Sequence, residues 1–328
     1  MENTVMNSEL LLPKGFCLLE TQVAGHTFSS DAKALGMLKN EILGCVLKPM
    51  GKPECGEREL AFYECVTDSN DPILNKVRSL IPKFYEKIKL RVNTMDHTFL
   101  KLEDLTHCIK KPCIMDIKIG KRTWDPLATA EKRDIEEKKY VQCKQKLGLC
   151  LPGFQVYSKT PLTQEEVLLR YGKDYGRQLN DSEFRKTMSL FLQCQKVVCW
   201  PLVQELLTQL YAIRDWFSEQ RLFHFYASSL LVVYDYETVQ FLTGTTQNGS
   251  KETLPNGNAQ NDVCDFKYED LAPTALSSAR HVQNVSPYIK VRMIDFAHVF
   301  PASDGSPDTN YIFGLQNLIK IIEDLLSR

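Results

Sequence analysis

An acid and a base stand two residues apart inside an apolar run at residues 111–120, KPCIMDIKIG. The run has the composition of a strand, and side chains two residues apart along a strand point to the same face. Asp116 and Lys118 are therefore predicted to share one face. Each charge costs several kcal/mol to remove from water unless it is paired or bound. The run indicates either a strand that holds a ligand or an edge strand with a surface ion pair.

The composition is that of a globular protein without a strong overall charge. A chain of 328 residues with 43% hydrophobic residues is long enough for one large domain or two lobes. Its net charge of −1 gives no attraction to nucleic acid. Eleven cysteines without a C-x-x-C pair indicate reduced thiols. We see no signal peptide and no apolar run long enough to span a membrane, and we expect an intracellular monomer, in the nucleus, the cytoplasm or both.

The pattern of apolar residues predicts an α+β protein. The elements expected in the first third are strands at 16–19, 22–27, 44–48, 97–105 and 113–119 and helices at 57–66 and 71–80. The elements expected beyond it are a long polar helix at 129–147, an amphipathic helix at 196–220, a strand pair at 225–234 and 289–294, and a last helix at 311–326. Residues 237–286 have little apolar periodicity and predict a flexible insert.

A second apolar strand ends in an acid at residues 292–298, RMIDFAH. An aspartate at the carboxyl end of a strand is well placed to hold a metal that bridges nucleotide phosphates, although such a residue also caps strands. His298 either lies near a transferred phosphate or satisfies a buried hydrogen bond. The segment therefore makes Asp295 a candidate metal ligand.

A lysine at a strand end precedes a predicted helix. Lys48 ends the strand, and Glu59 follows eleven residues later in the helix, an arrangement similar to the lysine and helix glutamate of protein kinases. A solvated lysine is the alternative. The sequence contains neither G-x-G-x-x-G nor G-x-x-x-x-G-K-[ST], which disfavours a Rossmann or P-loop nucleotide site.

Taken together, these motifs resemble those of the inositol phosphate kinases. The family pattern Pro-x-x-x-Asp-x-Lys-x-Gly is filled by Pro112, Asp116, Lys118 and Gly120. The strings SSLL at 228–231 and IDFAH at 294–298 follow in the family's order. Within the family, the strings at 100–107, 111–120 and 291–301 are most similar to those of the multikinase branch, and the early string QVAGH at 22–26 also fits this resemblance.

The resemblance implies a two-lobed, protein-kinase-like α+β fold with antiparallel sheets and helices, and with ATP in the cleft between the lobes. The N-lobe would be residues 1–104 and the C-lobe residues 105–328. The implied catalytic residues are Asp116, Lys118 and Asp295. The implied ATP-binding residues are Lys48, Glu59, Asp116, Asp295 and the main chain of Glu103 and Leu105. Asp295 would hold Mg²⁺, and Asp116 would reach either the ribose or the reacting phosphate.

The acceptor side should be basic, because inositol phosphates are densely anionic. Residues 110–146 contain eleven Lys or Arg and six Asp or Glu, although a solvated charged helix would have the same composition. In the family, helices placed as those at about 125–147 form the inositol phosphate site, and Lys132 matches a lysine used there. Residues 133–136 depart from the glutamine-containing stretch of the vertebrate multikinases. The candidate acceptor-binding residues are Lys118, Lys121, Arg122, Lys132, Lys139 and His298.

The implied reaction is Mg²⁺-dependent transfer of the ATP γ-phosphate to inositol 1,4,5-trisphosphate and inositol tetrakisphosphates, towards the pentakisphosphate. A phosphoinositide lipid headgroup is a further expected acceptor. Two alternatives within the family are a single-position inositol trisphosphate 3-kinase and an inositol hexakisphosphate kinase. A non-catalytic scaffold that binds inositol phosphates is an alternative of another class. The presence of Lys48, Asp116, Lys118 and Asp295 argues against the scaffold.

Overall fold

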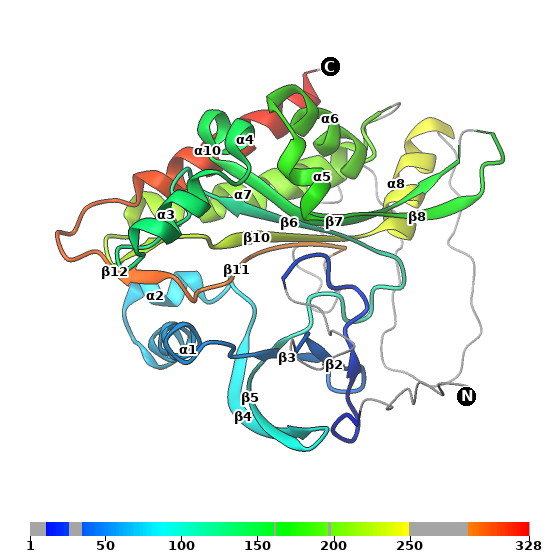
Figure 1. Cartoon of the computed structure of the whole chain (residues 1–328). Helices are drawn as coiled ribbons and strands as arrows, with labels where there is room; N and C mark the ends of the chain where they lie inside the picture. Colours follow the sequence, from blue (N-terminus) through cyan, green and yellow to red (C-terminus); the bar gives the residue numbers. More distant parts are fainter. Residues whose placement is uncertain (1–10, 26–34, 161, 196–197, 249–287, 328) are drawn as a thin grey trace, which may run out of the picture.

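The computed structural model describes residues 11–25, 35–160, 162–195, 198–248 and 288–327. Its strands form two five-stranded antiparallel sheets, of order β1-β2-β3-β5-β4 and β11-β10-β6-β7-β8, and a two-stranded ribbon of β12 and β9. Helices α4, α6, α7 and α10 lie on one side of the second sheet, and the first sheet lies on the other side together with α1 (Figure 1). The predicted α+β class is confirmed.

The strands are as follows: β1 (Cys17–Leu18), β2 (Leu38–Asn40), β3 (Cys45–Pro49), β4 (Phe84–Val92), β5 (Met95–Glu103), β6 (Pro112–Ile119), β7 (Leu149–Lys159), β8 (Glu166–Tyr171), β9 (Phe223–Phe225), β10 (Ser229–Asp235), β11 (Ile289–Ile294) and β12 (Val299–Pro301). The helices are α1 (Pro53–Asp68), α2 (Pro72–Val77), α3 (Ala130–Glu137), α4 (Val141–Leu147), α5 (Lys173–Gln178), α6 (Asp181–Phe191), α7 (Trp200–Glu219), α8 (Tyr236–Asn248) and α10 (Thr309–Leu326). Within these described residues, no helix is long and apolar enough to cross a membrane.

Strand β6 lies in the middle of the second sheet, between β10 and β7. Lys118 is half-buried and every other residue of the strand is buried. This position excludes the surface ion pair on an edge strand. Asp116 and Lys118 therefore share a face inside the protein, where their charges require compensation.

Helix α1 carries a predicted site residue and packs through an apolar stripe. Pro53 occupies its first position, where the missing N–H of proline costs no helical hydrogen bond. Leu60, Tyr63 and Val66 on one side of the helix are buried in the main core. Glu59 is also buried, which holds its carboxylate against the protein interior.

Helix α10 covers the end of β6 through a contact that requires glycine. A Cβ atom on Gly314 would lie 2.4 Å from the carbonyl oxygen of Gly148 and 2.9 Å from the amide nitrogen of Gly120. Both distances are below any normal contact, so only glycine allows α10 to approach this closely. The contact fixes the chain where it leaves β6.

The predicted single helix at 129–147 is wrong, because the structure contains two helices, α3 and α4. The break lies at Tyr140, which adopts the left-handed conformation with φ of 54°. Helix α3 has no buried residue, whereas Cys143 and Leu147 of α4 are buried. A single straight helix would not keep α3 at the surface and bury the apolar side of α4.

Two other predictions need correction. Residues 22–25 of the predicted strand at 22–27 do not form a strand, and residues 26–27 lie outside the described residues. The start of the predicted flexible insert at 237–286 belongs to α8, in which Val239 and Leu242 are buried. The apolar spacing of three residues from Tyr236 to Val239 and Leu242 predicts this helix, but the polar stretch that follows obscured it. Residues 249–286 lie outside the described residues.

Candidate active site

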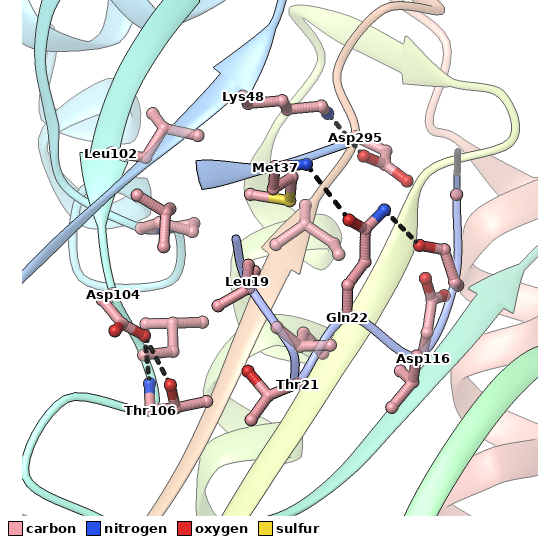
Figure 2. Close-up of a pocket in the computed structure, with 18 of the residues that line it drawn as sticks. Leu19, Thr21, Gln22, Met37, Lys48, Leu102, Asp104, Thr106, Asp116 and Asp295 are labelled. Carbon is pink, nitrogen blue, oxygen red and sulfur yellow. Dashed lines mark hydrogen bonds and ion pairs between the residues drawn. The ribbon is translucent and has the colours of Figure 1, made fainter. Parts of the chain in front are cut away.

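A cavity of about 390 Å³ lies between the two sheets. Its walls come from β3 and β5 of the first sheet, from β6, β10 and β11 of the second, and from residues 19–25 near the N-terminus (Figure 2). The predicted site residues among its lining are Lys48, Glu103, Leu105, Asp116 and Asp295. The structure therefore brings the predicted ATP-binding residues to one cavity, apart from Glu59, which lies behind Lys48.

Lys48 binds two carboxylates from different parts of the chain. Its Nζ lies 2.8 Å from Oε1 of Glu59 and 2.5 Å from Oδ1 of Asp295. Burial alone would lower the pKa of Lys48, but the two carboxylates outweigh it and raise that pKa above its ordinary value. The lysine is held charged and fixed in position, and the solvated alternative is excluded.

Asp295 is held at the end of β11 by its backbone and by its neighbours. Its φ of 63° lies in the left-handed region, which non-glycine residues seldom adopt. The hydroxyl of Ser228 donates to the carbonyl of Asp295 at 2.8 Å, and the N–H of Phe296 donates to Glu59 Oε1 at 3.1 Å. The ring of Phe296 packs against that of Phe62, with centroids 4.3 Å apart. These contacts direct the Asp295 carboxylate toward the cavity, as Figure 2 shows.

Asp116 faces the same cavity from β6 with an incomplete set of partners. Its Oδ1 is buried and makes no hydrogen bond to any described residue. Burial, and next the negative charge of Asp295, raise the pKa of Asp116 to about 6. A buried carboxylate oxygen without a partner, aimed at a cavity, is suited to accept a ligand hydroxyl or to contact a metal.

Lys118 lies one pleat further along the same face. It stands opposite Ser229 of β10 and Cys150 of β7, and it forms no salt bridge within the described part of the chain. Burial raises the pKa of both Asp116 and Asp295; the charge of Lys118 only partly offsets this rise at Asp116, whereas Lys48 and Lys118 together outweigh it at Asp295, whose pKa is lowered. Lys118 is therefore a cation near the two carboxylates that is free to bind an anionic ligand.

The segment after β5 offers the main-chain position predicted for adenine. The N–H of Glu103 already donates to the carbonyl of Lys83 at 2.9 Å. In the described residues the N–H of Leu105 has no such acceptor, and Leu105 lines the cavity. Asp104 Oδ1 accepts from the N–H of Thr106 at 2.8 Å and from its hydroxyl at 2.7 Å, which makes a tight turn at this place (Figure 2). Leu105 is thus available to a ligand, whereas the Glu103 N–H is not.

The residues after β6 form a cationic and aromatic cluster. The Arg122 guanidinium lies 3.7 Å from the ring centroid of Trp124 and 4.7 Å from that of Tyr226, so two rings hold it. Lys121 lies over the ring of Phe313 on α10 at 4.1 Å. Nδ1 of His298 lies 2.5 Å from Oδ2 of Asp125. Of the two roles considered for His298, the hydrogen bond is present, and it orients the imidazole.

Lys132 and Lys139 are brought together on α3 and just after it. Both ammonium groups bind the same carboxylate oxygen, Oε1 of Glu136, each at 2.8 Å. Burial opposes ionisation of Glu136, but the two lysines outweigh it and lower its pKa to about 2. Neither lysine is a free cation, which the count of basic residues did not reveal.

The sequence profile described as inositol polyphosphate kinase matches residues 99–323. The chain belongs to the inositol polyphosphate kinase family. The matched residues include β6, α3 and Asp295, and therefore most of the site described above.

Named relatives in this kinase family align with most of the chain. The inositol polyphosphate multikinase of Homo sapiens is 29% identical over 378 aligned positions, which cover 94% of this chain and 88% of the relative. The inositol hexakisphosphate kinase 3 of Mus musculus is 32% identical, in an alignment that covers 70% of this chain and 51% of that kinase. A crystal structure of the S. cerevisiae inositol phosphate multikinase with ADP and Mn²⁺ has a TM-score of 0.58 at 20% identity, covering 86% of this chain and 99% of that one. The last comparison supports the predicted fold.

Three contacts in this inositol polyphosphate kinase were not predicted from the sequence. Residues 19–25 cross the cavity, and a Cβ atom on Gly153 would lie 2.0 Å from the carbonyl oxygen of Val23, so glycine allows the crossing. The acid Asp125 orients His298 from 173 residues away. The hydroxyl of Ser228 supports Asp295. The only sequence signals were the family-like string at 22–26, the position of Asp125 in the basic window and the serine pair.

Proposed function

We propose that this chain transfers the γ-phosphate of ATP, in the presence of Mg²⁺, to hydroxyl groups of soluble inositol phosphates. The proposed sequence runs from inositol 1,4,5-trisphosphate through the tetrakisphosphate to the pentakisphosphate, with a phosphoinositide lipid headgroup as a further acceptor. One observation carries the proposal. Lys48, Asp116 and Asp295, from three different segments, meet at one cavity between two sheets.

ATP would occupy this cavity, whose volume of about 390 Å³ lies in the range of small-molecule sites. Lys48 is charged and fixed by Glu59, which suits it to bind the α- or β-phosphate. The free N–H of Leu105 would donate to adenine, at the apolar end formed by Leu102 and Val46. This orientation directs the γ-phosphate toward Asp116 and Lys118.

The residues present fit a divalent cation held partly by the nucleotide. Within the described residues, no group of three or more His, Cys, Asp or Glu side chains is arranged to hold a metal alone. Mg²⁺ is usually bound by one or two carboxylates together with phosphates and water. Asp295, with the unpartnered oxygen of Asp116 beside it, provides such a set. When bound, the ion would neutralise charge on the phosphates.

The acceptor would bind on the side of Lys118, where no described carboxylate pairs with the ammonium. Lys118 would contact both the acceptor and the transferred phosphoryl group. Arg122 is held by two rings, and its Nε donates to the carbonyl of Trp124 at 3.0 Å, which leaves the far side of the guanidinium for phosphate oxygens. His298, oriented by Asp125, would lie beside the acceptor.

The test is a time course of purified protein with Mg-ATP and inositol 1,4,5-trisphosphate, with products separated by chromatography. Successive tetrakis- and pentakisphosphate are expected, and the Asp295→Asn variant provides the inactive control. A halt at one tetrakisphosphate would indicate a single-position kinase. Product formation only from the hexakisphosphate would indicate a hexakisphosphate kinase. Binding of inositol phosphate without turnover would favour a scaffold and refute the proposal. A parallel incubation with phosphoinositide-containing vesicles tests the lipid acceptor.

A further inference from the structure

An ionised carboxylate lies inside the predicted acceptor site, on residue 136. Its Oε1 is bound at 2.8 Å by Lys132, four residues before it, and at 2.8 Å by Lys139, three residues after it. The carbonyl oxygen of the same residue accepts from the buried ammonium of Lys144. Three lysines therefore converge on Glu136, and its carboxylate neutralises one of the three positive charges.

The arrangement resembles the way in which proteins hold a phosphate oxygen. Two ammonium groups that each lie 2.8 Å from one oxygen are at most about 5.6 Å apart. A phosphate oxygen bound by two lysines requires the same geometry and the same charge. The exposed fractions of the Lys132, Lys139 and Glu136 side chains are 55%, 35% and 15%, so the lysines are open to solvent and the carboxylate sits beneath them.

This cluster is continuous with the catalytic strand. Lys118 stands opposite Cys150 in the sheet, and Cys150 is the second residue of β7, the strand that follows α4. The pKa of the Cys150 thiol, raised to about 12 chiefly by burial, also responds to the charges of Lys118, Lys144 and Glu136. Glu136 and Lys118 therefore both lie close enough to Cys150 for their charges to act on its thiol.

We propose that Glu136 is a built-in anionic competitor, which occupies Lys132 and Lys139 and sets how strongly the acceptor site binds phosphate groups. This inference rests on the proposed function, because it concerns the acceptor of that reaction. An incoming phosphate must displace the carboxylate from the lysines or bind beside it, and Coulomb repulsion opposes both. The opposition grows with the charge on the acceptor. Glu136 thereby favours inositol phosphates with fewer phosphate groups.

The test compares two variants that each remove one negative charge from α3. Glu136→Gln keeps the size and an acceptor oxygen but releases the lysine pair. Asp134→Asn is the matched control, because Asp134 pairs with Lys138 at 2.5 Å on the exposed side of the helix. Binding of inositol tris-, tetrakis- and hexakisphosphate is measured by calorimetry without ATP, so that catalysis is not required. ATP affinity is measured in parallel.

Glu136→Gln is expected to lower the dissociation constant for the trisphosphate by about tenfold, and for the hexakisphosphate by more. Asp134→Asn should change either constant by less than about twofold, because it acts through solvent. ATP affinity should not change in either variant. Adding Lys132→Met to Glu136→Gln should remove the gain, whereas adding Lys138→Met, which restores the same net charge away from Glu136, should leave most of it.

An unchanged or weaker affinity in Glu136→Gln would overturn the inference, as would an equal gain in Asp134→Asn. Weaker binding would mean that the carboxylate only holds the lysines in position. The outcome for the proposed function is read separately, from turnover. Turnover by the parent protein, with no change in inositol phosphate affinity in Glu136→Gln, would refute this inference alone. If the binding constants shift as expected but there is no turnover, the proposed function is refuted, and Glu136 still regulates anion binding.

Discussion

Asp116→Asn is expected to stabilise the protein while abolishing its activity. Burial and the charge of Asp295 raise the pKa of Asp116 from its ordinary value of 3.8 to about 6. The folded protein therefore binds this proton more tightly than the unfolded chain does. As the pH rises from about 4 to about 6, the unfolded chain releases the proton while the folded protein retains it, so the free energy of unfolding falls. Above about pH 6 the loss is complete and constant.

The size of the effect follows from the shift. A change from 3.8 to about 6 corresponds to about 3 kcal/mol at pH 7.5 and about 1.6 kcal/mol at pH 5. Asparagine carries no charge at either pH, so the variant escapes this cost. With an unfolding entropy of roughly 0.7 kcal/mol per degree for a chain of this length, Tm should rise by about 4 °C at pH 7.5 and by about 2 °C at pH 5.

The assay is thermal unfolding of both proteins at the two pH values, followed by circular dichroism without nucleotide. Glu59→Gln is the matched control, because it makes the same acid-to-amide change in the same site. Glu59 is an ion-pair partner of Lys48, so its neutralisation should lower Tm. An Asp116→Asn variant that is no more stable than the parent, or a gain that does not grow with pH, would refute the reasoning about its environment.

Three further substitutions test the site. Asp295→Asn should lower kcat by about 1000-fold or more with the fold intact by circular dichroism; normal turnover with Mg²⁺ would overturn the metal assignment. Lys118→Ala should lower kcat by about 100-fold and change the ATP dissociation constant by less than about threefold; equal losses in both would move Lys118 to the nucleotide side. Gly153→Ala should raise the KM for ATP and lower stability by about 1–3 kcal/mol, because its Cβ would meet the Val23 carbonyl at 2.0 Å; unaltered KM and Tm would show that residues 19–25 shift freely.

The sequence predicted most of the cavity because its key residues follow local rules. A period of two places Asp116 and Lys118 on one face of a strand, and β6 has that register. A strand followed by an amphipathic helix predicted the pairing of Lys48 with Glu59, which the 2.8 Å distance bears out. The functional roles of these residues remain predictions. What local rules provided was the direction of each side chain relative to its own element.

The parts that were missed depend on contacts between distant segments. Asp125 and His298 are 173 residues apart, and no local pattern connects them. Residues 19–25 cross over Gly153 in a close approach of two backbone segments. The only sign of this contact in the sequence is the glycine itself. The helix break at Tyr140 separates α3, which is exposed, from α4, which is partly buried. Helical propensity does not say which part of a helix will be buried, so it could not predict the break.

Counting charges overstated how basic the acceptor site is. Residues 110–146 have an excess of five positive charges. However, many of these cations already have acidic partners in the structure: Lys132 and Lys139 bind Glu136, Lys138 binds Asp134, Lys146 binds Asp181, and Lys111 binds Glu166 and Glu237. The spacing of four and three residues around Glu136 was readable, because it places all three side chains on one helical face. Of the predicted acceptor-binding cations, Lys118, Lys121 and Arg122 form no ion pair in the described part of the chain, so we expect the first contact with an anionic acceptor to depend mainly on these residues.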